Sequence, residues 1–463
     1  MIAFLKKTKL LFLAGIFIFT ACNEDDNVVD PSFDEDDEIA NLIVPDFYTF
    51  ERGGQSTVRI PGQVERIAML EEIDRAFTDF DGEEYGSTDA ASFEAVLNSL
   101  FINNPDDNIV WTNDFLNNTV LEGSDLNESG RQIRNTMADS EDYFLLPGNT
   151  AEAAKLRAQL DGFIVAQATN VFPNVNVEAA PGVAGFSVDS NNGTSNPTNR
   201  FINANGWEIN EVFEKSLIGS LQLDQIVNNY LSVILLDEGS NREDNDNEVP
   251  RNDSGTDTQM EHFWDEGFGY VYGLSCDIEN VTRDLGENDG NYNNYLDLVN
   301  DDLDFRGIAD EIFLAFRTGR AAIIASEYDI RDEQAAILRE LLSEVMAVRT
   351  VFYLQQGRMK LEGARADNGQ GEFGDGFHDV SEGLGFLLGL RFTQDPNTNQ
   401  PYYTPEQVQA WFTEITSSTP NGLWDIDLNR LDEISDAIAA PFGFTRQMAA
   451  FIDDSLPNSP GCE

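Results

Sequence analysis

Positive charge and histidine are scarce in this sequence. Its 463 residues include 28 Lys and Arg, 83 Asp and Glu and 2 His, so the formal net charge is −55. A chain this acidic cannot neutralise the phosphates of DNA or RNA, which excludes nucleic acids as general ligands. An anionic membrane surface would also repel it unless something other than charge provides the attachment. Hydrophobic residues make up 41% of the chain, which is enough to form a buried core.

Cysteine is almost as scarce. The three cysteines are Cys22, Cys276 and Cys462, and no CxxC motif or Cys/His metal cluster occurs. Cys276 and Cys462 lie far apart in the sequence and show no framework spacing, so a disulfide between them stays open.

The amino terminus predicts a secretion signal. Lysines precede an apolar run, residues 10–19, that is too short to span a bilayer but has the length of a signal-peptide core. The run ends in Phe-Thr-Ala-Cys22, which resembles a lipobox, so we expect residues 1–21 to be removed and Cys22 to carry palmitate and the other lipid chains of a lipoprotein. The alternative is an ordinary secreted protein cleaved near Ala21.

The segment after Cys22 is strongly acidic. Nine acids and no base occur between Asn23 and Ala40, without an apolar period, so residues 22–44 are predicted to be a disordered tether. Acids directly after a lipidated cysteine resemble the surface-export signal of Bacteroidota-type lipoproteins. The predicted location is therefore the outer membrane, lipid-anchored and facing the cell exterior.

The remainder, residues 45–463, is predicted to be mainly helical. Aromatic and β-branched residues flank Gly53-Gly54 within 47–60 and indicate a β-hairpin. Helices are predicted from about Val64, around 93–100 and over about 331–356, and Thr404 has the sequence of a capping-box N-cap. The stripe expected to face the core in the long helix consists of Ile337, Leu341, Val345, Val348 and Phe352. Two polar stretches, 187–199 and 237–258, are predicted as loops.

The two histidines stand in matching segments. Residues 262–274 (HFWDEGFGYVYGL) and 378–390 (HDVSEGLGFLLGL) agree at seven of thirteen positions in identity or aromatic character. We interpret this as an internal duplication. The predicted fold class is thus all-α (mainly): a duplicated helical bundle with a small N-terminal β-hairpin and long polar loops.

The repeated spacing predicts a metal site. His and Glu at i and i+4 lie on one helix face, and the glycines that follow would let a neighbouring helix approach closely. If the two helices meet, His262, Glu266, His378 and Glu382 would form a two-His, two-carboxylate set suited to iron, zinc or manganese. Glu261, Asp265 and Asp379 are candidate second-shell acceptors. The alternative is a purely structural helix pair.

Other chemistry has less support. No GxSxG or HExxH motif accompanies the histidines, so no catalytic residue is assigned and enzymatic activity stays open. The charged residues Glu208, Glu211, Lys215 and Asp224 are interpreted as a solvated or structural helix face, outside the site.

Several segments resemble those of known families. The hairpin Tyr48 to Val58, the helix from Asn205 to Gln225 and above all Glu261-His262-Phe-Trp-Asp265-Glu266 resemble an uncharacterised family of Bacteroidota lipoproteins, known as a domain of unknown function. A fainter resemblance is to imelysin-like proteins, all-α duplicated bundles on the bacterial outer surface that are associated with iron uptake. Their motif is Gly-x-His-x-x-Glu; Gly376-Phe377-His378 fits it, but the acid arrives one residue late, as Glu382.

Three functions follow as expectations. The first is a surface-tethered metal-binding or iron-acquisition accessory protein. The alternatives are an imelysin-like metallopeptidase and a glycan- or peptide-capturing lipoprotein that works with an outer-membrane transporter. The expected partners are the membrane, through the lipid on Cys22, and such a transporter, whereas nucleic acid is excluded.

Overall fold

The computed structural model describes residues 42–104, 111, 126, 130–143, 149–190, 197–252, 255–275, 277–283, 285–286, 291–366 and 372–452. The described residues from Val44 onward cluster as one compact unit. Cys22, Cys276, Cys462 and most of the acidic segment 22–44 lie outside the described residues. Among the helices described, none is both long and apolar enough to cross a bilayer.

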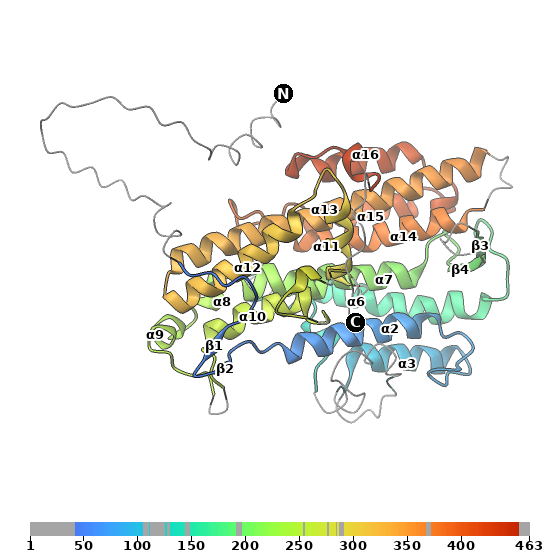
Figure 1. Ribbon diagram of the computed structural model, residues 1–463. Coiled ribbons are helices and arrows are strands. Elements are labelled where there is room, and N and C mark those ends of the chain that lie inside the picture. Colours follow the sequence, from blue (N-terminus) through green and yellow to red (C-terminus); the bar gives the residue numbers. More distant parts are fainter. Residues whose placement is uncertain are drawn as a thin grey trace, which may run out of the picture. The chain divides into compact units, whose positions relative to one another are not determined.

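The fold is mainly α-helical, as predicted (Figure 1). The α-helices are α2 (Pro61–Thr78), α3 (Ala90–Ile102), α5 (Ile133–Thr136), α6 (Thr150–Ala166), α7 (Ile209–Leu217), α8 (Val233–Leu236), α9 (Asn241–Asp246), α10 (Gln259–Tyr272), α11 (Tyr292–Asp301), α12 (Ile308–Ala325), α13 (Tyr328–Ala366), α14 (Gly374–Gly389), α15 (Pro405–Ser417), α16 (Leu428–Ala439) and α17 (Arg446–Ala449). Short turns include the π-helical η3 (Gln167–Val171), η5 (Ile218–Leu223) and η6 (Ile226–Tyr230) and the 3-10 turn η8 (Leu390–Phe392).

The predicted N-terminal hairpin is confirmed in a shorter form. Strands β1 (Glu51–Arg52) and β2 (Gln55–Ser56) pair antiparallel around Gly53 and Gly54. Both glycines have positive φ, 63° and 76°, the conformation that a tight two-residue hairpin turn requires and that glycine adopts most easily. The hairpin thus follows directly from the Gly-Gly pair in the sequence.

The two predicted polar loops contain secondary structure. Residues 187–199 overlap a second hairpin, in which β3 (Gly185–Asp189) pairs with β4 (Thr198–Ile202). The stretch 237–258 contains the short helix α9. Both elements were missed because most of their residues are polar. Phe186 and Phe201 face each other across the second hairpin, and the side chain of Asn245 in α9 donates a buried hydrogen bond to the Ile323 carbonyl.

The long helix α13 forms the middle of the bundle. It packs against α12, α14 and α16. The predicted core stripe was only partly right: Val345 and Val348 are buried, but the other three predicted residues are half-buried. Because neighbours cover α13 on several sides, its buried surface is wider than one stripe and includes Leu338, Leu342 and Met346.

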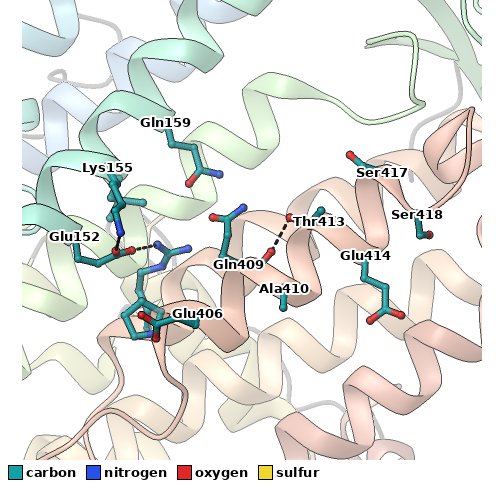
Figure 2. A pocket seen from close by; sticks show the side chains of 13 residues that line it. Glu152, Lys155, Gln159, Glu406, Gln409, Ala410, Thr413, Glu414, Ser417 and Ser418 are labelled. Carbon is teal, nitrogen blue, oxygen red and sulfur yellow. Dashed lines mark hydrogen bonds and ion pairs between the residues drawn. The ribbon is translucent and has the colours of Figure 1, made fainter.

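The two helices that carry the histidines pack mainly against different elements. Helix α14 lies between α13 and α7, whereas α10 packs against α2, α9, α12 and η6. Apart from η5, which contacts both, each histidine helix therefore has its own main neighbours. At another part of the unit, α6 and α15 flank an open groove (Figure 2).

Candidate metal centre

Helix α14 presents His378 and Glu382 on one face. The Nε2 atom of His378 lies 3.6 Å from Oε2 of Glu382, as expected for residues four apart in a helix. Two turns from the histidine, Gly385 lets α7 come close: a Cβ at this position would lie 2.5 Å from the Lys215 Cβ and 3.0 Å from the Glu211 carbonyl oxygen. The predicted role of this glycine in close helix packing is confirmed.

Helix α7 supplies two further carboxylates to His378. Oε2 of Glu208 lies 2.8 Å from Nδ1 of His378, and Oε1 of Glu211 lies 3.7 Å from the same nitrogen. Glu208 is the N-cap residue of α7, and its backbone N–H donates a hydrogen bond of 2.8 Å to Oγ of Ser381. This bond links the start of α7 to the face of α14 that carries the histidine.

The three side chains have the spacing of metal ligands. One ligand atom from each of Glu208, Glu211 and His378 lies within 4.8 Å of the others, and this is the one such group of three His, Cys, Asp or Glu residues within the described part of the chain. Ligands bonded to one metal at about 2 Å are separated by roughly 3 Å, so small movements suffice to close the group around an ion. Carboxylate and imidazole donors suit iron, manganese or zinc.

The charges around His378 favour its protonated form. Burial by itself lowers the pKa of His378, but the carboxylates of Glu382, Glu211 and Glu208 outweigh it and raise the pKa to about 10. Burial raises the pKa of Glu208, while His378 opposes that shift. For Glu211, burial is outweighed by His378 and Lys215, and its pKa is lowered. In the absence of a metal, a proton on the imidazole therefore balances part of the acidic cluster.

Two more cations complete this balance. Nζ of Lys215 lies 3.7 Å from both Glu211 and Glu382 and 2.5 Å from Glu214, and the residue is only 7% exposed. Arg200 of β4, held by a 2.8 Å bond to Asp189, acts electrostatically on Glu208. The second hairpin, absent from the sequence prediction, thus contributes to the charge balance of the centre.

Asp379, a predicted second-shell residue, faces a different cation. Its Oδ2 atom lies 2.7 Å from Nζ of Lys360, which also contacts Asp375 at 2.6 Å. Burial raises the pKa of Asp379 to about 7, although Lys360 opposes this shift. Asp379 therefore sits beside the His378 cluster in an ion pair of its own.

His262 on α10 has a simpler environment. Its Nε2 atom lies 3.5 Å from Oε1 of Glu266, and its Nδ1 atom lies 3.8 Å from Asp257. Gln63 donates a 3.0 Å hydrogen bond to Glu266, and Asp257 is paired with Arg251 at 2.5 Å. Burial is the main cause of a lowered pKa for His262. This imidazole is therefore neutral at neutral pH.

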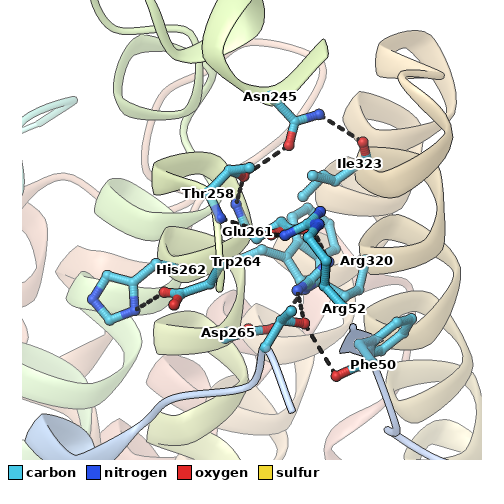
Figure 3. A network of polar contacts seen from close by, with 12 residues as sticks. Phe50, Arg52, Asn245, Thr258, Glu261, His262, Trp264, Asp265, Arg320 and Ile323 are labelled. Atoms are coloured by element: carbon cyan, nitrogen blue, oxygen red, sulfur yellow. Dashed lines mark hydrogen bonds and ion pairs between the residues drawn. The ribbon is translucent and has the colours of Figure 1, made fainter. Parts of the chain in front are cut away.

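Glu261 and Asp265, also predicted as second-shell residues, form ion pairs with an arginine instead. Arg320 of α12 is fully buried and donates to Asp265 at 2.9 Å and to Glu261 at 3.1 Å, and Arg52 of β1 adds a bidentate contact to Glu261 at 2.9 Å. Figure 3 shows His262 pointing away from this network. The two acids attach the N-terminal hairpin to α10 and α12, which corrects the second-shell assignment.

The structure does not bring His262, Glu266, His378 and Glu382 together as one ligand set. Each histidine contacts carboxylates of its own surroundings. The glycines explain the separation, because they fit each helix against a different neighbour. Gly269 of α10 meets Ile60 and Gln63 at the start of α2, whereas Gly385 of α14 meets α7. The two matching segments thus form two separate clusters rather than one shared centre. We call them the His378 corner, with Glu382, Glu208 and Glu211, and the His262 corner, with Glu266 and Asp257.

The sequence interpretation missed the α7 carboxylates. It assigned Glu208, Glu211 and Lys215 to a solvated or structural face, yet Glu208 and Lys215 are buried and Glu211 is half-buried. A signal was present: acids at i and i+3 with a lysine at i+7 occupy one helical face next to apolar residues. The sequence could not show that this face is turned inward, where charges need partners or ligands.

Comparison with known proteins identifies the family. A family described as "Domain of unknown function (DUF4856)" matches residues 45–445, which include both histidine corners and helix α7. The chain belongs to the DUF4856 family. No curated protein and no solved structure matches it. Membership in DUF4856 assigns no activity, and the resemblance to imelysin-like proteins stays a prediction.

Proposed function

We propose that this DUF4856 protein is a lipid-anchored surface protein that binds one divalent transition metal ion at Glu208, Glu211 and His378. The observation that carries the proposal is the spacing of the three ligand atoms, all within 4.8 Å of one another in a largely buried position. Iron, manganese and zinc are the candidate ions for this donor set.

The surroundings of His378 support a metal-bound orientation. Nδ1 faces Glu208 and Glu211, so this nitrogen would bind the ion, while Nε2 would keep its hydrogen and point it at Glu382. A carboxylate that accepts the remaining imidazole N–H is the usual outer-shell arrangement of metal-binding histidines. Glu382 would thus orient the imidazole of His378 rather than bind the ion directly.

The charge of the cluster supports exchange of a proton for a metal. His378 must lose a proton from Nδ1 before it can coordinate, and the incoming dication then takes over its charge balance with Glu208 and Glu211. Metal affinity is therefore expected to rise with pH below the His378 pKa of about 10.

The position at the cell surface follows from the sequence. A lipid on Cys22 and the acidic segment after it would hold the domain at the outer face of the outer membrane. A metal-binding protein in this position could assist a membrane transporter in iron acquisition. A Cys22→Ser change should release the protein from the membrane fraction; unchanged membrane association would refute the anchor.

Elemental analysis tests the metal site. The mature chain, residues 22–463, is dialysed separately against Fe(II), Mn(II) and Zn(II) and then freed of unbound ion. We expect about one equivalent of at least one metal in the wild type and loss of that metal in the Glu208→Gln/Glu211→Gln double variant, with the helical circular dichroism spectrum retained.

The other histidine corner supplies the matched control. A His262→Gln/Glu266→Gln variant removes an imidazole and a carboxylate outside the proposed site and should keep its metal. A wild type that retains none of the three metals, or a Glu208→Gln/Glu211→Gln variant that retains as much as the wild type, would rule out the site.

A further inference from the structure

Two carboxylates of the His378 corner each face a second cation. Oε1 of Glu211 lies 3.7 Å from Nδ1 of His378, whereas its Oε2 atom lies 3.7 Å from Nζ of Lys215. Glu382 divides its oxygens in the same way: Oε2 lies 3.6 Å from Nε2 of His378, and Oε1 lies 3.7 Å from the same Nζ atom. Each carboxylate therefore connects the imidazole to the ammonium group, with one oxygen toward each.

Glu214 completes the surroundings of Lys215. Its Oε2 atom lies 2.5 Å from Nζ, so three carboxylates from α7 and α14 contact one ammonium group. The lysine is buried, and the ring centroid of Tyr295 lies 5.6 Å from Nζ. Asp74 of α2 adds a further negative charge that acts on Lys215. The ammonium group thus occupies a defined, strongly anionic position between the helices.

Helix packing places Lys215 at this position. A Cβ on Gly385 of α14 would lie 2.5 Å from the Lys215 Cβ, so this part of α7 lies directly against α14. Glu211 and Lys215 are four residues apart and lie on one face of α7. The close contact that brings the α7 carboxylates to His378 therefore also brings the lysine.

The arrangement has two cation positions that share carboxylates. The first position is that of the proposed metal ion at Glu208, Glu211 and His378. The second is the position of Nζ of Lys215. In two-metal sites the ions lie about 3.5–4 Å apart, which is close enough for one carboxylate to bind both. A lysine ammonium is a compact point charge with three donors, so it can take the place of a cation among carboxylate oxygens.

We propose that Lys215 is a built-in second cation that limits this centre to one metal ion. The inference rests on the proposed function, because the first position must hold a metal. The ammonium group fills the space between Glu211, Glu214 and Glu382 and repels a further dication. It also holds Oε2 of Glu211 and Oε1 of Glu382 away from the first ion. Lys215 is thus a positioning residue that sets the metal stoichiometry.

Metal analysis of a Lys215→Ser variant tests this inference. The mature wild type and the variant are loaded separately with an excess of Fe(II), Mn(II) or Zn(II) and freed of unbound ion. With the ion that the wild type retains, we expect about one equivalent in the wild type and about two in the variant. Serine leaves room for the second ion, and rotation of the glutamate side chains can bring oxygens from 3.7 Å to the bonding distance of about 2 Å.

A second substitution locates the added ion. Lys215→Ser/Glu214→Gln removes one of the three carboxylates around the second position and should return the metal content to about one equivalent. Two equivalents in this double variant would place the added ion elsewhere and contradict the inference.

Lys360→Ser is the matched control. Lys360 also lies between two carboxylates of α14, Asp375 at 2.6 Å and Asp379 at 2.7 Å, which belong to neither cation position. This variant should keep about one equivalent. A rise to two equivalents here as well would show that the effect is not specific to Lys215.

The outcomes separate this inference from the proposed function. A wild type without metal refutes the proposed function, and the inference with it. A wild type with one equivalent and a Lys215→Ser variant with one or none refutes the inference alone, as does a wild type that retains two. If Lys215→Ser is unfolded without metal, an ion that replaces the ammonium group should restore the helical circular dichroism spectrum. No restoration with any of the three ions would contradict the inference, since a lysine with only a structural role cannot be replaced by a metal.

Discussion

The two histidine corners begin from the same motif and reach opposite electrostatic states. On α14, three carboxylates surround His378 and raise its pKa to about 10. On α10, His262 has the same i, i+4 glutamate, yet its pKa is lowered, mainly by burial. One imidazole is therefore a cation at neutral pH and the other is neutral.

The neighbouring helices cause this difference. Next to α14, helix α7 brings Glu208 and Glu211 up to the imidazole. Next to α10, the nearby acid Asp257 is already paired with Arg251, and Glu266 accepts a bond from Gln63. A repeated motif thus fixes one partner of each histidine, whereas the surrounding helices decide its charge and its capacity to bind a metal.

The largest effect should come from removing the lysine that compensates the α14 corner. In Lys215→Met, the half-buried carboxylates of Glu211 and Glu214 and the buried one of Glu382 lose a common cation. Loss of one partner from a buried ionic cluster costs about 3–5 kcal/mol. We expect the free energy of unfolding in urea to fall by that amount, with a lower midpoint.

The corresponding change at the α10 corner is Gln63→Met. It removes the neutral hydrogen-bond donor to Glu266 but no cation. The free energy of unfolding should therefore fall by only about 1–2 kcal/mol. If Gln63→Met proved as damaging as Lys215→Met, the conclusion that only the carboxylates around His378 depend on a compensating lysine would be wrong.

A smaller effect is expected from the motif glycines. In Gly385→Ala the new Cβ meets the backbone oxygen of Glu211 at 3.0 Å and the Cβ of Lys215 at 2.5 Å, so α7 and α14 must move apart. Overpacking of this kind costs about 1–3 kcal/mol. Metal binding should weaken together with stability, because α7 carries two of the three proposed ligands.

Gly267→Ala is the control on α10, at a motif glycine that no neighbouring element approaches closely. Its Cβ would meet Tyr230 at 3.5 Å, an ordinary contact, and alanine favours the helix by up to about 1 kcal/mol. Thermal unfolding should show no loss of stability in this variant. Equal destabilisation by the two substitutions would show that the close approach of α7 is not the reason why position 385 needs glycine.

The sequence predicted the elements of the fold better than their contacts. The Gly53-Gly54 turn, the helical state of both histidine segments and the long helix near 331–356 depend on local patterns, and the structure contains all of them. The second hairpin was missed because a polar stretch of eight residues, 190–197, separates its strands in the sequence, in place of a two-residue turn such as Gly53-Gly54. Local spacing also could not show that α13 is covered on several sides.

The candidate site shows the same limit. His378 and Glu382 are four residues apart, so their common face followed from helix geometry alone. Glu208 lies far away in the sequence and comes within 2.8 Å of His378 only because Gly385 admits α7. Without knowledge of which helices are neighbours, the histidine of the other motif copy was the natural but wrong choice of partner.

The last comparison concerns the pH dependence of stability, which should have opposite signs at the two corners. His378 has a raised pKa, so its stabilising contribution is complete below about pH 6.5 and is lost as the pH rises toward 10. His262 has a lowered pKa, so its contribution is present above pH 6.5 and is lost as the pH falls.

Urea unfolding of the metal-free protein between pH 7.5 and 9.5 separates the two. The raised pKa values of Asp224, Asp265 and Asp379 are all about 7, so these acids are largely ionised throughout this window. The stability difference between wild type and His378→Gln should shrink by up to about 1.4 kcal/mol per pH unit, the limit for one proton. The difference between wild type and His262→Gln should stay constant in the same window and should change only below pH 6.5. A constant difference for His378→Gln would mean that the three carboxylates do not hold a proton on this imidazole, and the contrast between the corners would then be one of geometry alone.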